Sequence, residues 1–374
     1  MISRSCVLNY IQFVMLRFLE RFKPQSLKGD IFGGVTTAII SLPMGLVFGE
    51  ASGAGAQAGL YGAVLVGLFA AVFGGTTRLI SEPTGPMTVV MTAIFADMMA
   101  RHPEHGLAMS FGAVIIAGLV QVIFGALKLG RYVTMMPYSV ISGFMSGIGV
   151  LLILLQLGPV LGQDKPDGGA LAIVQALPEL FANIQWNEAS LALLALAVLF
   201  FMPKKWSTYV PPHLIALVLG TGASLWFFGI GFDEVKRIGE IPMGLPEFRF
   251  PPLMADQLTE LALDGLVLGM LGCIDTLLTA MIADSLTREQ HDSDRELIGQ
   301  GIGNTLSGFF GGLPGAGATM GTVVNIQVGA TSPLAGVIRA VLLLLVIVAV
   351  APLLVSIPLA VLSAIALKVG LDIL

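Results

Sequence analysis

One stretch, residues 308–324 (GFFGGLPGAGATMGTVV), constrains the fold of this chain more than any other. It is full of helix breakers: Pro314 lacks a backbone donor, and the glycines around it make an ordered helix costly. The segments on both sides are apolar enough to cross a bilayer. Non-helical backbone at membrane depth is tolerated only where it is buried in protein or lines a wet cavity. The stretch therefore predicts a broken helix within a membrane domain, with a Gly/Pro loop outside the membrane as the alternative.

A new helix is expected to begin directly after this break, at Thr319. Its free N–H groups and positive dipole end would point at the occupant of the break, which favours an anion. A second copy of the pattern lies in the first third of the chain. FGG at 73–75 precedes SEPTGPMTVV at 81–90, much as FGG at 310–312 precedes GATMGTVV at 317–324. Such paired interrupted segments point to the binding site of a transporter.

The composition sets the class of protein. Hydrophobic residues make up 55% of the chain and charged residues 11%, with a mean hydropathy of +0.89. These values exclude a soluble domain and predict an all-α polytopic membrane protein. No Walker A motif, zinc-ligand spacing, basic nucleic-acid patch or nucleophile–base pair is visible in the sequence. We therefore expect no enzyme activity, no cofactor and no nucleic-acid partner.

Twelve spans are predicted, with boundaries good to a few residues. They lie near 31–50, 58–75, 84–99, 107–127, 132–156, 189–203, 207–230, 258–284, 296–312, 319–330, 333–354 and 357–374. The segments 84–99 and 319–330 are the two half-helices. Segment 189–203 is too short for a straight crossing unless it is tilted or continued by the amphipathic segment 170–184.

The basic residues predict the orientation. With the N-terminus in the cytoplasm, fourteen of the 19 Lys and Arg fall on the cytoplasmic side, as the positive-inside rule requires. They are Arg4, Arg17, Arg21, Lys23, Lys28, Arg78, Lys128, Arg131, Lys204, Lys205, Arg288, Arg295, Arg339 and Lys368. The outer side holds Arg101, Lys165, Lys236, Arg237 and Arg249. Residues 1–29 are expected to form a cytoplasmic lead-in, and residues 30–374 a transmembrane domain that continues in a longer protein.

Ionisable residues inside the spans are functional candidates. Asp275 lies in the middle of a span, and Thr279 lies one turn further on the same helix face. A carboxylate and a hydroxyl suit a sodium ion, whose shell could be completed by backbone carbonyls freed at the break near Gly317 and Thr319. The alternative is a protonated Asp275 that is hydrogen-bonded across helices. Glu82, beside the first break, has either a structural role or a role in coupling.

Threonines begin both half-helices, at positions 84, 88, 319 and 322. Their hydroxyls are suited to cap these helices, to bind substrate, or to do both. Two opposed helix N-termini with one buried carboxylate describe a small-anion site beside a cation site, whose charges offset each other's burial cost. The pattern predicts sodium–anion symport by an alternating-access mechanism.

The sequence resembles the SulP anion transporter family, and within it the cyanobacterial BicA-type sodium-dependent bicarbonate transporters. The likeness covers essentially all of residues 28–374. The motifs that carry it are GDIFGGVTTAIISLPMGLVFG at 29–49, ASGAGA at 51–56, SEPTGPMTVV at 81–90, GFMSGIG at 143–149 and GAGATMGT at 315–322.

This resemblance implies two inverted seven-span repeats that form a core domain and a gate domain, with half-helices as the third and tenth spans. It also implies bicarbonate contacts from Thr84, Gly85 and Ala318, with Thr279 close by. The sodium ligands that it implies are Asp275, Thr279, Gly317 and Thr319. Family members carry two further spans and a cytoplasmic STAS domain that supports homodimers, which this sequence does not include.

The function predicted is sodium-dependent uptake of bicarbonate across the plasma (inner) membrane. The alternative within transporters is a symporter or exchanger of sulfate or another oxyanion, including proton-coupled ones. An anion channel and a nontransporting motor-like membrane protein are alternatives of a different class. A channel ranks low because it would not explain a buried aspartate at the break.

Overall fold

The computed structural model describes residues 25–133, 138–164, 169–203, 211–229, 235–239, 246–248, 250–251, 258–349 and 354–374. Most of the predicted lead-in, residues 1–24, lies outside these ranges. So do several of the basic residues used to predict the orientation: Arg4, Arg17, Arg21, Lys23, Lys165, Lys204, Lys205 and Arg249.

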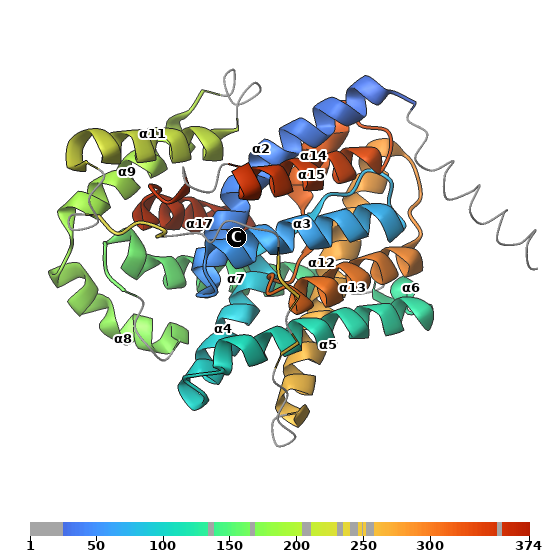
Figure 1. Cartoon of the computed structure of the whole chain (residues 1–374), viewed down its shortest axis with the longest axis horizontal. Coiled ribbons are helices and arrows are strands. Elements are labelled where there is room, and N and C mark those ends of the chain that lie inside the picture. The colour runs from blue at the N-terminus through green and yellow to red at the C-terminus, as the bar shows by residue number, and fades with distance from the viewer. Residues whose placement is uncertain are drawn as a thin grey trace, which may run out of the picture.

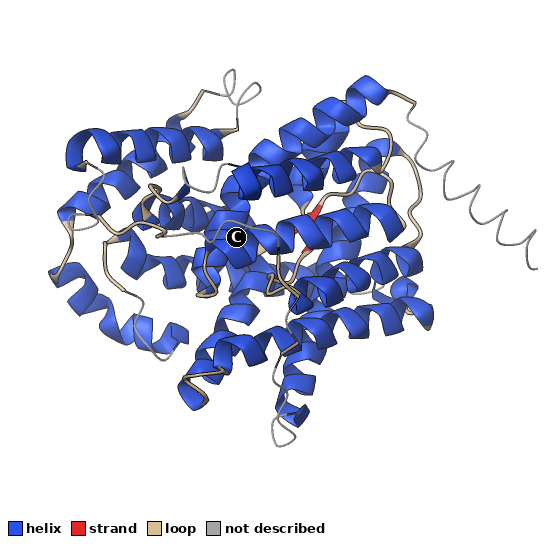
Figure 2. Cartoon of the chain, in the orientation of Figure 1, coloured by secondary structure: helices blue, strands red, loops and turns tan. Residues whose placement is uncertain are grey.

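The described part of the chain is almost entirely helical, with one two-stranded ribbon (Figure 2). The first half of the chain contains α2 (Leu27–Ser52), α3 (Ala56–Phe73), β1 (Ser81–Glu82), α4 (Gly85–Arg101), α5 (Gly106–Ala126), α6 (Gly130–Val133), α7 (Tyr138–Val160) and α8 (Gly169–Ala182). The second half contains α9 (Trp186–Phe201), α11 (Pro212–Phe228), α12 (Leu258–Thr287), α13 (Ser293–Phe309), β2 (Ala316–Gly317), α14 (Thr319–Gln327), α15 (Leu334–Ala349) and α17 (Leu359–Ile373).

The helices form two groups that lie side by side (Figure 1). The first group contains α2 to α6 and α12 to α15, and in it α2 packs against the late helices α14 and α15. The second group contains α7, α8, α9, α11 and α17. The groups meet where α2 packs on α17 and where α4 packs on α7. This division agrees with the expected core and gate domains.

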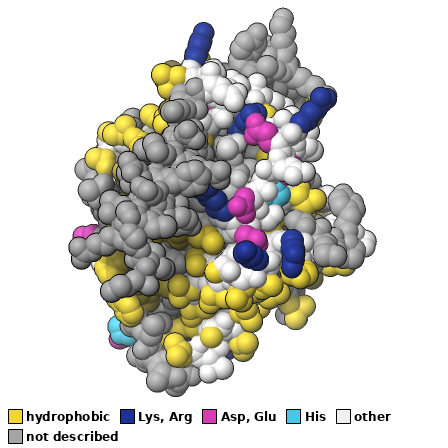
Figure 3. Space-filling model, turned by 90° about the vertical axis from the view of Figure 1, so that its right-hand side faces the viewer, with side chains coloured by type: hydrophobic (Ala, Val, Ile, Leu, Met, Phe, Trp, Pro, Cys, Tyr) yellow, Lys and Arg dark blue, Asp and Glu magenta, His cyan; other side chains and the backbone are white. Residues whose placement is uncertain are grey.

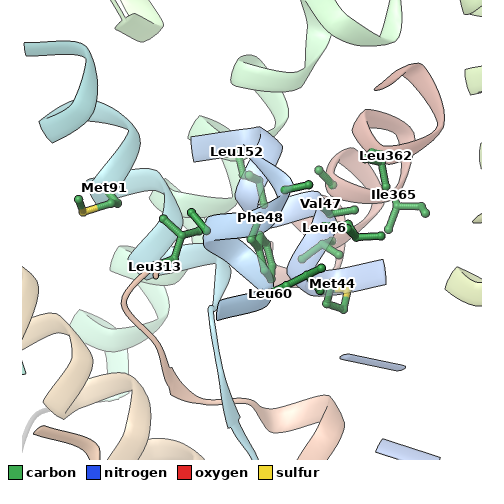
Figure 4. Close-up of a cluster of buried hydrophobic side chains, with 14 of the residues drawn as sticks. Met44, Leu46, Val47, Phe48, Leu60, Met91, Leu152, Leu313, Leu362 and Ile365 are labelled. Carbon is green, nitrogen blue, oxygen red and sulfur yellow. The ribbon is translucent and has the colours of Figure 1, made fainter. Parts of the chain in front are cut away.

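A cluster of buried apolar side chains fills the junction between the groups (Figure 4). Phe48 of α2 and Leu60 of α3 lie on the side of the first group, and Leu152 of α7 and Leu362 of α17 on the side of the second. All four are at most 2% exposed. Because side chains from both groups share this core, a movement of one group against the other must repack it.

Four described helices are long and apolar enough to cross a bilayer alone: α2, α3, α5 and α12. Segments 171–182 and 186–201 pass the same test only together and are bent by 110° at the break between them. The predicted short span at 189–203 therefore begins at a sharp corner after the amphipathic segment, rather than continuing it. The number of twelve crossings remains a prediction.

Large apolar side chains are exposed over wide areas of the described surface. On the face seen in Figure 3, acidic and basic side chains gather beside a field of apolar side chains. Other large apolar side chains point outward from α9 and α11, including Phe201 at 84% and Trp226 at 85% exposure. Such apolar areas are expected where a protein faces lipid.

Candidate functional site

The two predicted breaks meet in a short antiparallel ribbon at the centre of the first group. Ser81 of β1 pairs with Gly317 of β2, and Glu82 pairs with Ala316. A further bond from the Ala318 N–H to the Ile80 carbonyl, 2.8 Å long, extends the ribbon toward α14. The irregular backbone of each break thus satisfies polar groups of the other, as is required away from water. Each strand leads within two residues into a half-helix: β1 into α4 and β2 into α14.

Side chains of α13 hold the second break in place. The Asn304 amide accepts a 2.7 Å bond from the Gly315 N–H and donates a 2.9 Å bond to the Gly315 carbonyl. The Ser307 hydroxyl donates to the Leu313 carbonyl over 2.7 Å. Gly311 has φ +67°, a left-handed conformation that favours glycine. The break is therefore a fixed structure, built by polar side chains that replace helical backbone partners.

Asp275 of α12 is joined to the start of the first half-helix. The Thr84 hydroxyl donates a 2.7 Å hydrogen bond to Asp275 Oδ2. Thr84 is 8% exposed and Asp275 is 6% exposed. The two residues are 191 positions apart in the sequence. The bond therefore fixes one carboxylate oxygen by a partner on α4 and leaves the other oxygen available to a ligand.

Thr279, one turn after Asp275, is joined to the second half-helix. Its hydroxyl donates to the Gly317 carbonyl over 2.8 Å and lies 3.0 Å from the Thr319 hydroxyl. The Gly317 N–H donates to the Thr276 hydroxyl over 3.2 Å. A Cβ added to Gly317 would lie 2.9 Å from the Thr279 Cβ, so this close approach requires glycine. Hydroxyl and carbonyl oxygens of this kind are hard ligands, which suit an alkali cation.

The N-terminal backbone donors of both half-helices lack side-chain caps. Thr84 is the N-cap of α4, and Ala318 is the N-cap of α14, and neither side chain makes a capping bond. The Thr84 hydroxyl is used on Asp275, and the Thr322 hydroxyl accepts the Ile80 N–H. Of the two roles considered for these threonines, capping is therefore excluded for Thr84. Uncapped helix N-termini attract anions.

The start of α4 also touches the second group of helices. A Cβ added to Gly85 would lie 2.9 Å from Ile373 Cδ1 and 3.6 Å from Leu152 Cδ2. These two side chains belong to α17 and α7. The N-terminal end of α4 therefore lies at the boundary between the two groups.

One basic residue lies in a different place from that predicted. Arg339 was counted among the charges of the cytoplasmic side, but it is completely buried in α15 and forms an ion pair with Glu82, 2.7 Å long. Its guanidinium also donates to the Ser41 hydroxyl and the Ser81 carbonyl. This observation assigns Glu82 a structural partner. The count for the cytoplasmic side falls from fourteen to thirteen.

The predicted site residues all come together at the ribbon. They are Thr84, Gly85, Asp275, Thr279, Gly317, Ala318 and Thr319. Within the described ranges, no group of three His, Cys, Asp or Glu residues is suited to hold a metal ion. The sequence patterns did not point to Thr276, Asn304 or Arg339 as site residues. For Arg339 a signal existed, because a basic residue within the apolar segment 334–349 requires a buried partner.

The fold and the site define a polytopic helical membrane protein of the transporter type, built around two half-helices that start from the antiparallel ribbon of β1 and β2. The chain belongs to the sulfate permease family, whose sequence profile matches residues 27–374.

Individual relatives are similar over almost the whole chain. The chain is 60% identical to the bicarbonate transporter BicA of Synechocystis sp. and 58% identical to that of Picosynechococcus sp., over 94% of its length in both comparisons. It spans 62% of the length of each relative. The solved transmembrane domain of a cyanobacterial bicarbonate transporter BicA superimposes with a TM-score of 0.90 at 60% identity, covering 93% of this chain and 88% of that one.

Proposed function

We propose that the protein is a sodium-dependent bicarbonate symporter that takes up inorganic carbon by alternating access. The observation that carries this proposal is the double link from α12 to the two half-helices, Asp275 to Thr84 and Thr279 to Gly317. It places oxygen atoms of the kind that bind a cation, on one turn of α12, beside two uncapped helix N-termini. The similarity to proteins described as bicarbonate transporters supports bicarbonate as the anion.

In this proposal, sodium is a co-substrate held by oxygen atoms. Asp275 supplies the charge, and Thr279, Thr319 and the Gly317 carbonyl supply neutral oxygens. Bicarbonate lies between the N-termini of α4 and α14, against Thr84, Gly85 and Ala318, with Thr279 close by. A sodium ion offsets the negative charge of the bicarbonate beside it, so each ion lowers the cost of burying the other. This mutual dependence is the basis of coupling.

Transport follows from movement of the first group of helices against the second. The ribbon and the linked helices α4, α12 and α14 carry both ions as one unit. Gly85, Ile373 and Leu152 mark the boundary at which access changes. Such rocking of one bundle around a fixed site is the general form of alternating access.

The second candidate is a symporter or exchanger of sulfate or another oxyanion. The description of the family as sulfate permeases favours it, and helix N-termini attract sulfate as well as bicarbonate. We further propose a plasma-membrane location with a cytoplasmic N-terminus, and a full-length homodimer formed through a cytoplasmic domain outside this sequence. The remaining partner of the chain is the lipid bilayer.

Uptake of radiolabelled bicarbonate by purified full-length protein in proteoliposomes tests the proposal. Initial rates are measured with and without an inward sodium gradient, and with sulfate as competitor. Sodium-stimulated uptake that is indifferent to sulfate is the expected result. Sodium-independent uptake, or strong competition by sulfate, would move the assignment to the second candidate.

A further inference from the structure

Three buried charged residues lie in the two breaks or bond directly to them in the described part of the chain: Glu82, Asp275 and Arg339. A fourth, Glu296, is linked to Ser81 only indirectly, through the Gln300 amide. Glu82 and Arg339 form an ion pair, and Arg339 is 0% exposed. Asp275 has a hydroxyl partner, Thr84, but no ion-pair partner among the described residues. The three charges therefore sum to one net negative charge. Such a charge is costly to bury unless a cation joins it.

Arg339 is hydrogen-bonded directly to the ribbon. Its guanidinium donates to the Ser81 carbonyl over 2.9 Å and to Glu82 Oε2 over 2.7 Å. Ser81 pairs with Gly317, whose carbonyl is a predicted sodium ligand. Arg339 is thus one strand away from the proposed sodium site. At this separation in a protein interior, a unit charge changes the affinity of an ion substantially.

Glu82 lies beside the second half-helix as well as the first. A Cβ added to Gly321, in the first turn of α14, would lie 3.7 Å from Glu82 Oε1. A carboxylate in this position opposes the binding of an anion at the α14 N-terminus, since both are negative. Its pairing with Arg339 cancels this opposition. The pair is therefore close enough to both ions to influence each of them.

The sequence makes room for this arrangement. A Cβ added to Gly67 of α3 would lie 2.3 Å from Arg339 Nη1 and 2.9 Å from the Ser81 carbonyl. The Ser41 hydroxyl of α2 accepts from Arg339 Nε over 2.7 Å. Four elements, α2, α3, β1 and α15, thus meet at one guanidinium group. A neutral apolar residue would fill the position at a lower desolvation cost, which points to a use for the charge.

We propose that Arg339 is the charge-balancing and positioning residue of the transport site: by neutralising Glu82, it leaves the empty site with the single negative charge of Asp275, so that sodium binds first and bicarbonate second. This inference rests on the proposed function and adds the order of binding to it. An anion that arrives first meets a net negative site. An anion that arrives after sodium meets a neutral site lined by two helix N-termini.

The test is the sodium dependence of bicarbonate uptake in proteoliposomes. It is measured on the full-length wild type, on a variant that removes a negative charge near the site and on a variant that adds one. Glu82→Gln removes one negative charge. It is expected to raise the sodium concentration for half-maximal uptake on the order of tenfold and to produce uptake without sodium. Ser41→Asp adds a negative charge next to Arg339. It is expected to lower that sodium concentration and to raise the KM for bicarbonate.

Two control variants separate charge from structure. Glu82→Gln combined with Arg339→Gln restores the net charge, and it should return the half-maximal sodium concentration to within about twofold of wild type. Gly67→Ala displaces the guanidinium without changing any charge, so it should lower the maximal rate without creating sodium-free uptake. Size-exclusion profiles show which variants fold. Ser41→Asp and the double variant keep the inference testable if Glu82→Gln does not fold.

The outcomes separate this inference from the proposed function. A wild type without sodium stimulation would overturn both. A sodium-stimulated wild type, with folded charge variants whose half-maximal sodium concentration does not change, would overturn only the inference. If the half-maximal sodium concentration is unchanged and only the maximal rate falls in every variant, Arg339 has a structural role alone.

Discussion

The hydroxyl of Thr84 donates a 2.7 Å hydrogen bond to the carboxylate of Asp275, which joins the N-cap residue of a half-helix to the middle of a long helix 191 positions later. This contact connects the proposed anion site to the proposed sodium site through two side chains. It also orients the carboxylate, because a hydroxyl bonded to one oxygen fixes the direction of the other. Sodium binding and the position of α4 are therefore expected to depend on each other.

Removal of this hydroxyl should weaken sodium binding. In Thr84→Ala, Asp275 loses a hydrogen bond to a charged group, worth about 1.5–3 kcal/mol. We expect the sodium concentration for half-maximal uptake to rise roughly tenfold or more. Thr84→Ser keeps the hydroxyl and is the matched control, with an expected change within about twofold. Equal behaviour of the two variants would show that the bond has no part in sodium binding.

Neutralisation of Asp275 should abolish coupling. Asp275→Asn keeps the shape of the side chain and its place beside Thr84, but it removes the only charge in the proposed sodium ligand set. We expect sodium-stimulated uptake to fall at least about tenfold. Thermal unfolding in detergent should remain within about 5 °C of wild type, which separates a lost ion site from a lost fold. Wild-type uptake and sodium affinity in this variant would contradict the ion-site assignment.

Added bulk at Ala318 should block the anion before it affects sodium. Ala318 is the N-cap of α14 and is 9% exposed. In Ala318→Leu, the larger side chain enters the space proposed for bicarbonate, so the KM for bicarbonate should rise while sodium binding is retained. Met320→Leu, two residues further and 44% exposed, is the control for the same half-helix. Normal transport by Ala318→Leu would mean that this position does not face the substrate.

The close crossing of α2 and α3 predicts an effect on stability alone. A Cβ added to Gly59 would lie 1.9 Å from the Gly45 carbonyl oxygen, so Gly59→Ala must push the two helices apart. We expect it to destabilise the protein by ~1–3 kcal/mol. Gly222→Ala in α11 meets nothing within 4 Å and should be neutral or slightly stabilising, since alanine favours helix. Scanning fluorimetry in detergent would compare the two, and equal melting temperatures would contradict the packing.

The sequence predicted the broken segments because the causes are local. Pro314 and the glycines around it exclude a continuous helix in any context, and Thr84 and Thr319 follow breaks of the same kind. Asp275 and Thr279 were placed on one face by helical periodicity alone. The structure confirms that these residues meet, although their binding of sodium and bicarbonate remains a prediction.

What could not be predicted depends on contacts between distant segments. Arg339 was assigned to the cytoplasmic side because a count of basic residues does not include their partners. Glu82 is 257 positions away from it. Asn304 gave no signal, because a single amide in a helix does not reveal that it holds Gly315. The role of Asn304 becomes visible only once the packing of α13 is known, whereas Arg339 could have been recognised as a basic residue within an apolar segment.

The most direct test of the central claim is a measurement of both ions in the same proteoliposomes. Uptake of radiolabelled sodium is recorded with and without bicarbonate, and uptake of radiolabelled bicarbonate with and without sodium, for the wild type and Asp275→Asn. We predict that each ion stimulates the uptake of the other in the wild type and that neither effect survives in the variant. Bicarbonate uptake that proceeds without accompanying sodium in the wild type would contradict the account.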